Sequence, residues 1–160
     1  MNFRTFKQVL VATALSVASV VTLNSCDKDD DNNNNRTYTI SGNAVGNQVV
    51  PSVAGTGTGS ISGTYDPNTR VLTYNTGWTG LTGAPTSAGF YSGTSGASGT
   101  LVGNPWTFGA NPGVTGNTNG SMTLTPDQGN QLTTGGWYYT YGTSANPGGE
   151  VRGQITTTQQ

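Results

Sequence analysis

Apolar and polar residues alternate in short stretches from residue 37 onward, which is the pattern of half-buried β-strands. Strands are predicted over residues 37–45, 55–65 and 70–78. Between the last two, Asp66-Pro67-Asn68-Thr69 places turn-forming residues where a hairpin needs them. We therefore expect these two strands to pair as an antiparallel hairpin.

A second strand pair is predicted near the C-terminal end. Four aromatic residues fall within Trp137–Tyr141, and a short β-branched run follows at Glu150–Ile155. The residues between them include Asn146-Pro147-Gly148-Gly149, a cluster that is typical of a turn or loop. We expect two antiparallel strands joined by a long connection, with this cluster as a structural motif.

The middle of the domain gives weaker signals. Residues 120–125 alternate cleanly, and residues 89–92 and 100–102 are predicted as short strands. Thr125 followed by Pro126 has the form of a helix N-cap with proline in the first helical position, so a short helix is expected near residues 126–134. Loops are expected at residues 80–88 and 111–119.

Composition favours an all-β domain. The 160 residues include 25 glycines, and only 8% of the residues are charged, whereas Thr, Ser and Asn are abundant. About seven to nine short antiparallel strands without an evident repeat of about 20–50 residues argue for a sandwich or a partly closed barrel. We predict one such domain over residues 37–158.

Residues 1–25 have the form of a secretory signal peptide. Arg4 and Lys7 precede an apolar run at residues 9–21, which is short for a spanning helix of about 20 apolar residues. A buried helix or a true membrane anchor is the alternative. The sequence Leu23-Asn24-Ser25-Cys26 resembles a bacterial lipobox, which implies that Cys26 becomes an acylated N-terminus held in a membrane. The alternative for Cys26 is an ordinary free thiol.

A polar tether is predicted over residues 26–36, because this stretch has no apolar periodicity with which to bury a core. Its segment Lys28-Asp29-Asp30-Asp31 resembles the acidic surface-export signal of lipoproteins in the Bacteroidota. The resemblance implies an outer-membrane lipoprotein whose domain faces the cell exterior. A solvated spacer without a role in export is the alternative.

Charge and residue counts exclude several classes of function. The net charge is −1, and removing Arg4 and Lys7 with the signal peptide leaves 6 − 2 = 4 basic against 7 acidic residues, hence −3. No basic patch remains to pair with phosphates, so nucleic acid is not an expected partner. The chain has no histidine and one cysteine, which excludes the usual zinc, haem and cysteine-cluster sites. No metal or cofactor is expected.

The order of these segments resembles the chordin-type (CHRD) domain over about residues 37–157. The resemblance is carried by four segments: Gln48–Pro51, Gly55–Ser60, Leu72–Asn75 and, above all, Ser144–Ile155. It implies an immunoglobulin-like Greek-key sandwich or barrel, secreted or lipid-anchored, with no established catalytic activity. Members commonly carry a His-x-His pair and a further histidine where this chain has Gly89-Phe90-Tyr91 and Gly142. The resemblance therefore implies that any metal site of the family is lost here.

Few residues could carry chemistry. Glu150 and Arg152 lie two apart on a predicted strand and are expected to share a face. They are either an acid or anion clamp or, as we favour, a structural ion pair or backbone brace. Asp66 and Asp127 are explained by turn and helix-start contexts. Without a histidine base or paired carboxylates, we predict that the protein is not an enzyme and has no catalytic residues.

The aromatic residues are the remaining candidates. On a strand, Trp137, Tyr139 and Tyr141 share one face, which is either core, as we favour, or an outward platform for sugar rings or a protein partner. Trp106, beside Pro105 in an expected loop, is the best single candidate for an exposed contact. We predict a lipid-anchored envelope domain with a non-catalytic binding or structural role, whose partner is an extracellular protein or glycan. A carbohydrate-binding accessory module with exposed aromatics is the alternative.

Overall fold

The computed structural model describes residues 36–160. The predictions for the signal peptide, Cys26 and the segment Lys28–Asp31 lie outside these residues. Within residues 36–160, no helix has the length and apolar character needed to cross a membrane.

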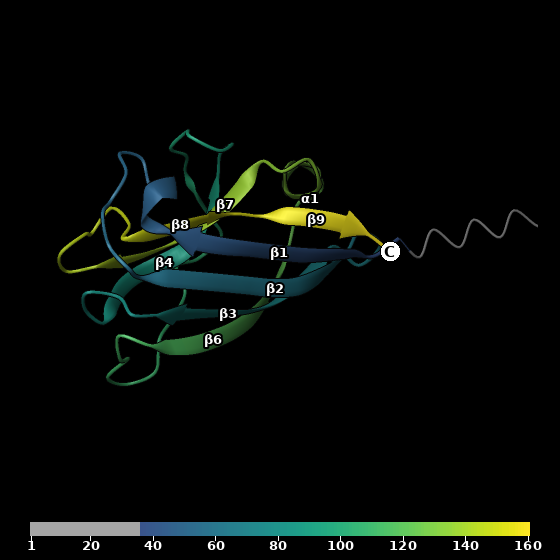
Figure 1. The fold of residues 1–160 in the computed structure, drawn as a ribbon. Coiled ribbons are helices and arrows are strands. Elements are labelled where there is room, and N and C mark those ends of the chain that lie inside the picture. Colours follow the sequence, from purple (N-terminus) through teal and green to yellow (C-terminus); the bar gives the residue numbers. More distant parts are fainter. Residues whose placement is uncertain (1–35) are drawn as a thin grey trace, which may run out of the picture. The chain divides into compact units, whose positions relative to one another are not determined.

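One antiparallel sheet of nine strands forms the described domain (Figure 1). The strands follow the order β5-β4-β7-β8-β1-β2-β3-β6 across the sheet, and β9 pairs with the first half of β1. Their bounds are β1 Tyr38–Val45, β2 Thr58–Asp66, β3 Val71–Thr79, β4 Pro85–Ser92, β5 Leu101–Val102, β6 Gly116–Thr123, β7 Trp137–Thr143, β8 Val151–Gln154 and β9 Thr156–Gln159. Two short helices complete the domain, η1 at Gly46–Gln48 and α1 at Pro126–Thr133.

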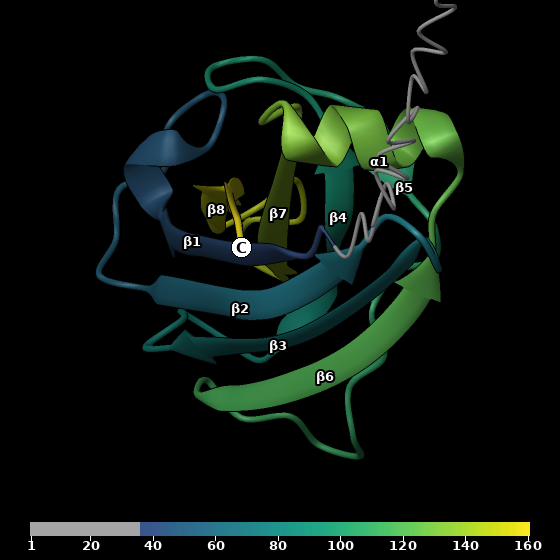
Figure 2. The ribbon, with the colours of Figure 1, turned by 90° about the vertical axis from the view of Figure 1, so that its right-hand side faces the viewer.

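The sheet curls on itself, so that β4 and β7 lie across from β2, β3 and β6 (Figure 2). The all-β class is confirmed, and the architecture is that of a partly closed barrel made by a single curled sheet. Curling places one face of every long strand in a shared interior, which is how a small sheet buries a core without a second layer.

The predicted hairpin is confirmed as β2 and β3, which pair continuously from Thr58 with Thr79 to Asp66 with Val71. Asp66 organises the turn, since its carboxylate accepts from the Asn68 backbone N–H at 2.8 Å and from the Thr69 hydroxyl at 3.0 Å. These bonds hold the pKa of Asp66 below its usual range. The aspartate is thus a turn residue, as its sequence context indicates.

The short helix α1 is also confirmed. Thr125 and Gln128 form a capping box, with the Gln128 N–H donating to the Thr125 hydroxyl and the Thr125 N–H donating to the Gln128 side chain. Pro126 occupies the first turn, where its missing N–H costs nothing. Leu132 anchors the helix and is fully buried.

Two loop predictions are wrong in part. Strand β4 begins at Pro85 inside the expected loop 80–88, and β6 begins at Gly116 inside the expected loop 111–119. The residues Gly116–Asn119 carry no apolar alternation, yet β6 pairs with β3 at every position from Gly116 to Thr123. Pairing with a neighbouring strand, rather than local pattern, creates these strand segments.

Aromatic rings from β3 cover the inner face of β6, because β6 has glycine opposite them. Tyr74 pairs with Gly120 and Trp78 pairs with Gly116. A Cβ at Gly120 would lie 2.6 Å from the Tyr74 hydroxyl, and one at Gly116 would lie 2.5 Å from Cζ2 of Trp78. Any larger residue at these positions would displace a ring from the core.

We predict that Gly116→Ala lowers the free energy of unfolding by about 1–3 kcal/mol, because the added methyl group overlaps the Trp78 ring. Gly148→Ala is the control, since no atom lies within 4 Å of its Cβ position, and a change within about 0.5 kcal/mol is expected. Urea unfolding followed by tryptophan fluorescence measures both. Equal midpoints for the two variants would contradict the proposed ring packing.

Candidate functional site

Trp106 is buried, with 8% of its surface exposed, so the prediction of an exposed contact residue is wrong. Its ring stacks on Tyr74 at 5.4 Å between centroids and meets the edge of Phe90 at 5.0 Å. The Trp106 backbone N–H donates to the Ala88 carbonyl at 2.8 Å, which holds the β5–β6 connection against β4. The connection therefore directs Trp106 into the barrel, a result of tertiary position that the local sequence around Pro105 does not reveal.

The aromatic residues of β7 are core, as favoured from the sequence, and the platform alternative is wrong. Trp137, Tyr139 and Tyr141 have no exposed surface. The Tyr139 hydroxyl donates to the Gly42 carbonyl at 3.0 Å, and the Tyr141 hydroxyl lies 2.6 Å from that of Thr76. Burial raises the pKa of both phenols. Both phenol hydroxyls are hydrogen-bonded inside the barrel, and none of the three side chains offers a surface to a ligand.

Glu150 is a buried carboxylate at the start of the final strand pair, with 2% of its surface exposed. Its Oε1 accepts from the Thr82 backbone N–H at 2.7 Å, and its Oε2 accepts from the hydroxyls of Thr143, at 2.7 Å, and Thr82. Burial alone would raise the pKa of Glu150, but these hydrogen bonds outweigh it and leave the pKa below its usual value. Glu150 thus fixes the β3–β4 connection.

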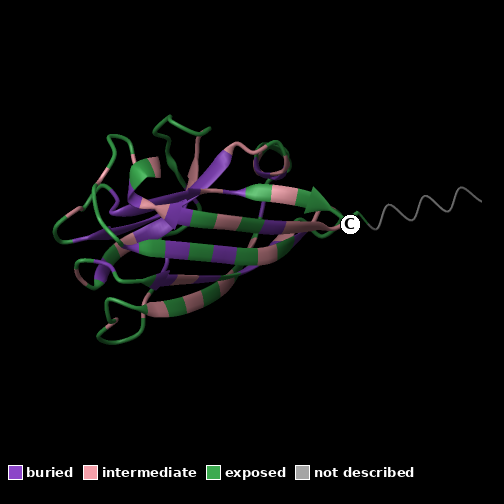
Figure 3. Ribbon diagram, in the orientation of Figure 1, coloured by how far each residue is buried: buried purple, intermediate pink, exposed green. Residues whose placement is uncertain are grey.

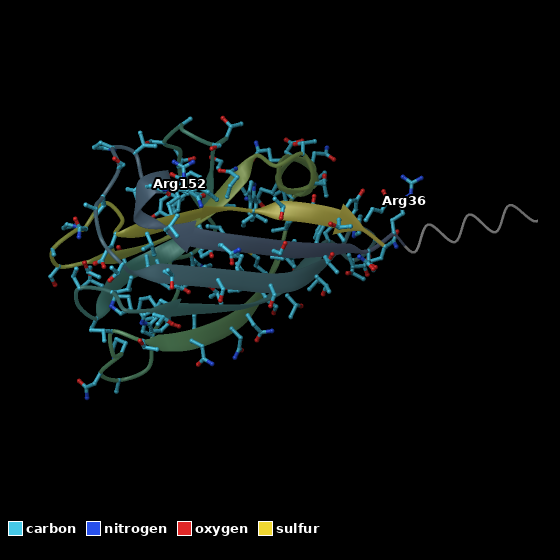
Figure 4. All side chains as sticks on the ribbon, in the orientation of Figure 1. Arg36 and Arg152 are labelled. Atoms are coloured by element: carbon cyan, nitrogen blue, oxygen red, sulfur yellow. The ribbon has the colours of Figure 1, made fainter. Side chains whose placement is uncertain are left out.

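Arg152 is also buried, with 3% exposed, but it faces the other side of the sheet. Its guanidinium lies 3.6 Å from the centre of the Tyr138 ring, and Nη2 donates to the Thr94 carbonyl at 2.8 Å. Figure 4 shows Arg152 between the loops at one end of β1, while Arg36 lies at the other end. Burial lowers the pKa of Arg152.

The expectation that Glu150 and Arg152 share a face is therefore wrong. Glu150 bonds to Thr143, on the inner side of β7 with Tyr141, whereas Arg152 lies over Tyr138 on the outer side. Glu150 precedes β8 and follows Gly149, whose φ is +131°, so the alternation of a strand does not apply to it. Of the two structural interpretations of this pair, an ion pair or a backbone brace, these contacts agree with the backbone brace.

Gln154 completes this group and was missed from the sequence. Its Nε2, which carries two hydrogens, lies within hydrogen-bond distance of three carbonyls, those of Trp137 at 2.8 Å, Gly135 at 2.8 Å and Gly93 at 3.0 Å. Its backbone N–H donates to the Gln48 side chain at 3.1 Å. The available signal was the spacing of Arg152 and Gln154, which lie two apart on β8 and therefore share its outer side. We call Glu150, Arg152 and Gln154 the brace residues, because each ties the β8 region to surrounding connections.

The cluster Asn146–Gly149 forms the tight turn between β7 and the brace residues. The Thr143 and Asn146 backbones exchange two hydrogen bonds, of 3.2 and 3.1 Å, and the Gly149 N–H donates to the Asn146 carbonyl at 3.0 Å. Pro147 and Gly148 are exposed, whereas Gly149 is buried. The predicted turn motif thus orients Glu150 toward the interior.

The outer face of β9, β1, β2, β3 and β6 is polar and without charge over three rows of side chains, which we call the polar face. Strand register defines the rows as Thr158–Thr39–Thr64–Thr73–Ser121, Thr156–Ser41–Ser62–Asn75–Asn119 and Asn43–Ser60–Gly77–Asn117. Exposed and less exposed residues alternate along these strands (Figure 3). The polar face therefore spans five neighbouring strands of the described domain.

The surface of the described domain is hollowed in several places, of which a furrow and a cleft are the more spacious. A furrow of about 580 Å³ follows the row from Asn43 to Asn117 across β1, β2, β3 and β6. A cleft of about 400 Å³ lies between β6 and residues 103–107, with Tyr74 and Trp106 among its lining residues. Among the described residues, no group of three His, Cys, Asp or Glu side chains could hold a metal ion.

A single curled antiparallel sheet with an aromatic interior and buried brace residues defines a small β-domain in the described part of the chain. The family model of the CHRD domain matches residues 20–155. The chain belongs to the CHRD domain family, a family of non-enzymatic domains. Comparison with curated proteins found no match, and comparison with solved structures found none.

We predict that Glu150→Gln lowers the free energy of unfolding at neutral pH by about 1–3 kcal/mol, because the amide cannot accept all three hydrogen bonds. Since the folded pKa lies below the ordinary value of 4.5, the stability due to the carboxylate is present above that value. It is lost as the pH falls through the folded pKa. The difference between the two proteins should therefore shrink in acid.

Urea midpoints measured over a pH series test this expectation. Asp127→Asn is the matched control, because Asp127 is exposed in the first turn of α1 and its change should cost less than about 1 kcal/mol. A difference between wild type and Glu150→Gln that stays constant with pH would rule out the role assigned to the charge.

Proposed function

We propose that this CHRD domain is a lipid-anchored, non-catalytic domain of the outer membrane that faces the cell exterior. The lipobox-like sequence ending in Cys26 supports acylation, and the acidic run Lys28–Asp31 supports export to the surface. Two or three acyl chains hold a protein firmly, whereas a single chain binds only marginally. The domain would then work where it is displayed, by contact with other molecules of the envelope or its surroundings.

The proposal of a non-catalytic role rests on one observation. Charged side chains of the described domain are used to hold its backbone in place. Asp66 closes a turn, Glu150 accepts three hydrogen bonds from Thr82 and Thr143, and Arg152 stacks on Tyr138. A reactive group must be positioned against substrate and able to change its protonation or bonding state. These side chains are instead committed to holding backbone segments, which supports a binding or structural role.

The surface available for such a role is the polar face and not an aromatic platform. Its Ser, Thr and Asn side chains can both donate and accept hydrogen bonds, and they carry no charge. This surface is suited to an extracellular glycan or protein partner with polar, uncharged groups of its own. Binding there leaves the aromatic core undisturbed.

We predict that Cys26→Ser moves the protein from the membrane fraction to the soluble fraction, because a serine hydroxyl cannot take the place of the acylated thiol. Fractionation, together with incorporation of a labelled fatty acid, measures the change. Asn32→Ser, which leaves the lipobox intact, should stay in the membrane and keep the label. Membrane association of Cys26→Ser at the wild-type level would refute the lipid anchor.

We further predict that replacing Asp29, Asp30 and Asp31 by Ser keeps the protein acylated but leaves the domain inside the outer membrane. Protease treatment of intact cells of a Bacteroidota host should then degrade the wild type and spare the variant. Replacing Asn33, Asn34 and Asn35 by Ser preserves the tether length and should leave the protein accessible. If the triple-Asp variant is degraded as readily as wild type, the acidic run is only a spacer.

A further inference from the structure

Two rows of the polar face have side chains that form no hydrogen bond within the domain. On β1 and β9, the hydroxyls of Ser41 and Thr156 lie 3.0 Å apart, and the Thr39 hydroxyl donates to the Thr158 carbonyl at 3.3 Å. By contrast, the side chains of Asn43, Ser60 and Asn117 form no hydrogen bond within the described domain, and neither do those of Ser62, Asn75 and Asn119 in the adjacent row. All six residues are exposed. Their hydrogen-bonding capacity is available to a ligand.

Of these six residues, only Asn43, Ser60 and Asn117 line the furrow of about 580 Å³. Asn43, Ser60, Gly77 and Asn117 form one side, and Val45, Thr58, Thr79 and Thr115 form the other. Between the two sides lie the inward-facing positions Ala44, Gly59, Trp78 and Gly116, whose backbone makes the floor. Gly77 has no side chain, so nothing projects from this row where it crosses β3. The furrow therefore runs across four strands, about 14 Å between the outer two at the usual strand spacing.

The direction of the furrow disfavours an extended peptide as its ligand. A peptide that adds to a sheet needs a free strand edge. The floor crosses β2 and β3, which are each paired on both sides, so their backbone groups are already bonded. The furrow presents hydroxyl groups and side-chain amides to a ligand. These groups both donate and accept hydrogen bonds, as sugar hydroxyls do.

The lack of charged residues in the furrow narrows the class of ligand further. None of the residues that line the furrow is ionisable. Of the described arginines, Arg36 lies at the far end of β1, Arg70 follows the β2–β3 turn, and Arg152 is buried beneath loops. An acidic polysaccharide would find no cation in the furrow, and burying its carboxylates there would cost free energy.

We propose that the furrow on the outer face of β1, β2, β3 and β6 binds a neutral glycan chain, with Asn43, Ser60 and Asn117 as its hydrogen-bonding residues. The chain lies across the strands and exchanges hydrogen bonds with these side chains. The proposal rests on the proposed function, since surface display is what brings the furrow to extracellular glycans. It assigns that contact to a specific row, in place of the buried aromatic residues.

The test is affinity electrophoresis of the full chain, purified in detergent, through gels that contain dextran, mannan, xylan, β-1,3-glucan or, as acidic probes, alginate and polygalacturonate. We expect at least one neutral polysaccharide to retard the wild type, and the acidic ones to have no effect. Asn43→Ala with Asn117→Ala should weaken the retarding interaction about tenfold or more, because two hydrogen-bonding groups are lost.

Asn75→Ala with Asn119→Ala is the matched control, since it removes two asparagines from the adjacent row of the same face, outside the furrow. This control should bind as wild type does, and equal urea midpoints for the two double variants show that both are folded.

Three results would overturn the proposal. They are retardation by none of the neutral polysaccharides, equal weakening in the two double variants, and retardation by the acidic polysaccharides alone. Because the test uses purified protein, its failure is distinguishable from a failure of the lipid anchor, which fractionation of Cys26→Ser reports.

Discussion

Strand β7 is buried along its whole length on both faces, and the rest of the domain is arranged to cover it. Its inner side chains, Trp137, Tyr139 and Tyr141, require a closed interior, which the curled sheet and Trp106 supply. Its outer side requires a second cover, because Tyr138 and Thr140 are also buried. In a small single-sheet domain, only the connecting loops can provide that cover.

The brace residues hold those loops in place. Arg152 bonds to the connection that follows β4, and Gln154 bonds to that connection and to the residues just before β7. Glu150 holds the β3–β4 connection from the other side. A buried ionised group is costly unless it is hydrogen-bonded or stacked, and here each charge is satisfied by backbone groups, hydroxyls or a ring. The motif that carries the family resemblance is therefore a device for closing the fold.

This arrangement divides the sheet into a half that stabilises the fold and a half with an exposed outer face. The half that contains β4, β7 and β8 is covered and devoted to stability, whereas the half that contains β1, β2, β3 and β6 presents its outer face to the surroundings (Figure 2). The exposed half carries neither charges nor aromatic rings over the three rows of the polar face. The glycan-binding role that we propose is assigned to these exposed groups, while the core chemistry explains the fold.

The sequence by itself determined the features that local rules control. The β2–β3 turn depends on Asp66 and its near neighbours, the helix depends on the Thr125–Gln128 capping box, and the family is carried by contiguous segments. Each of these features involves residues close together in the chain, so it can be predicted from the sequence without a structure.

Only the tertiary structure decided where Trp106 points, on which side Glu150 and Arg152 lie, and that Gly116–Asn119 belong to a strand. Those outcomes depend on partners far away in sequence, such as β4 for the β5–β6 connection and β3 for β6. The furrow has the same origin, because strand register brings Asn43, Ser60 and Asn117 into one row. Alternation along a single strand shows which residues face outward, but register alone shows which of them meet.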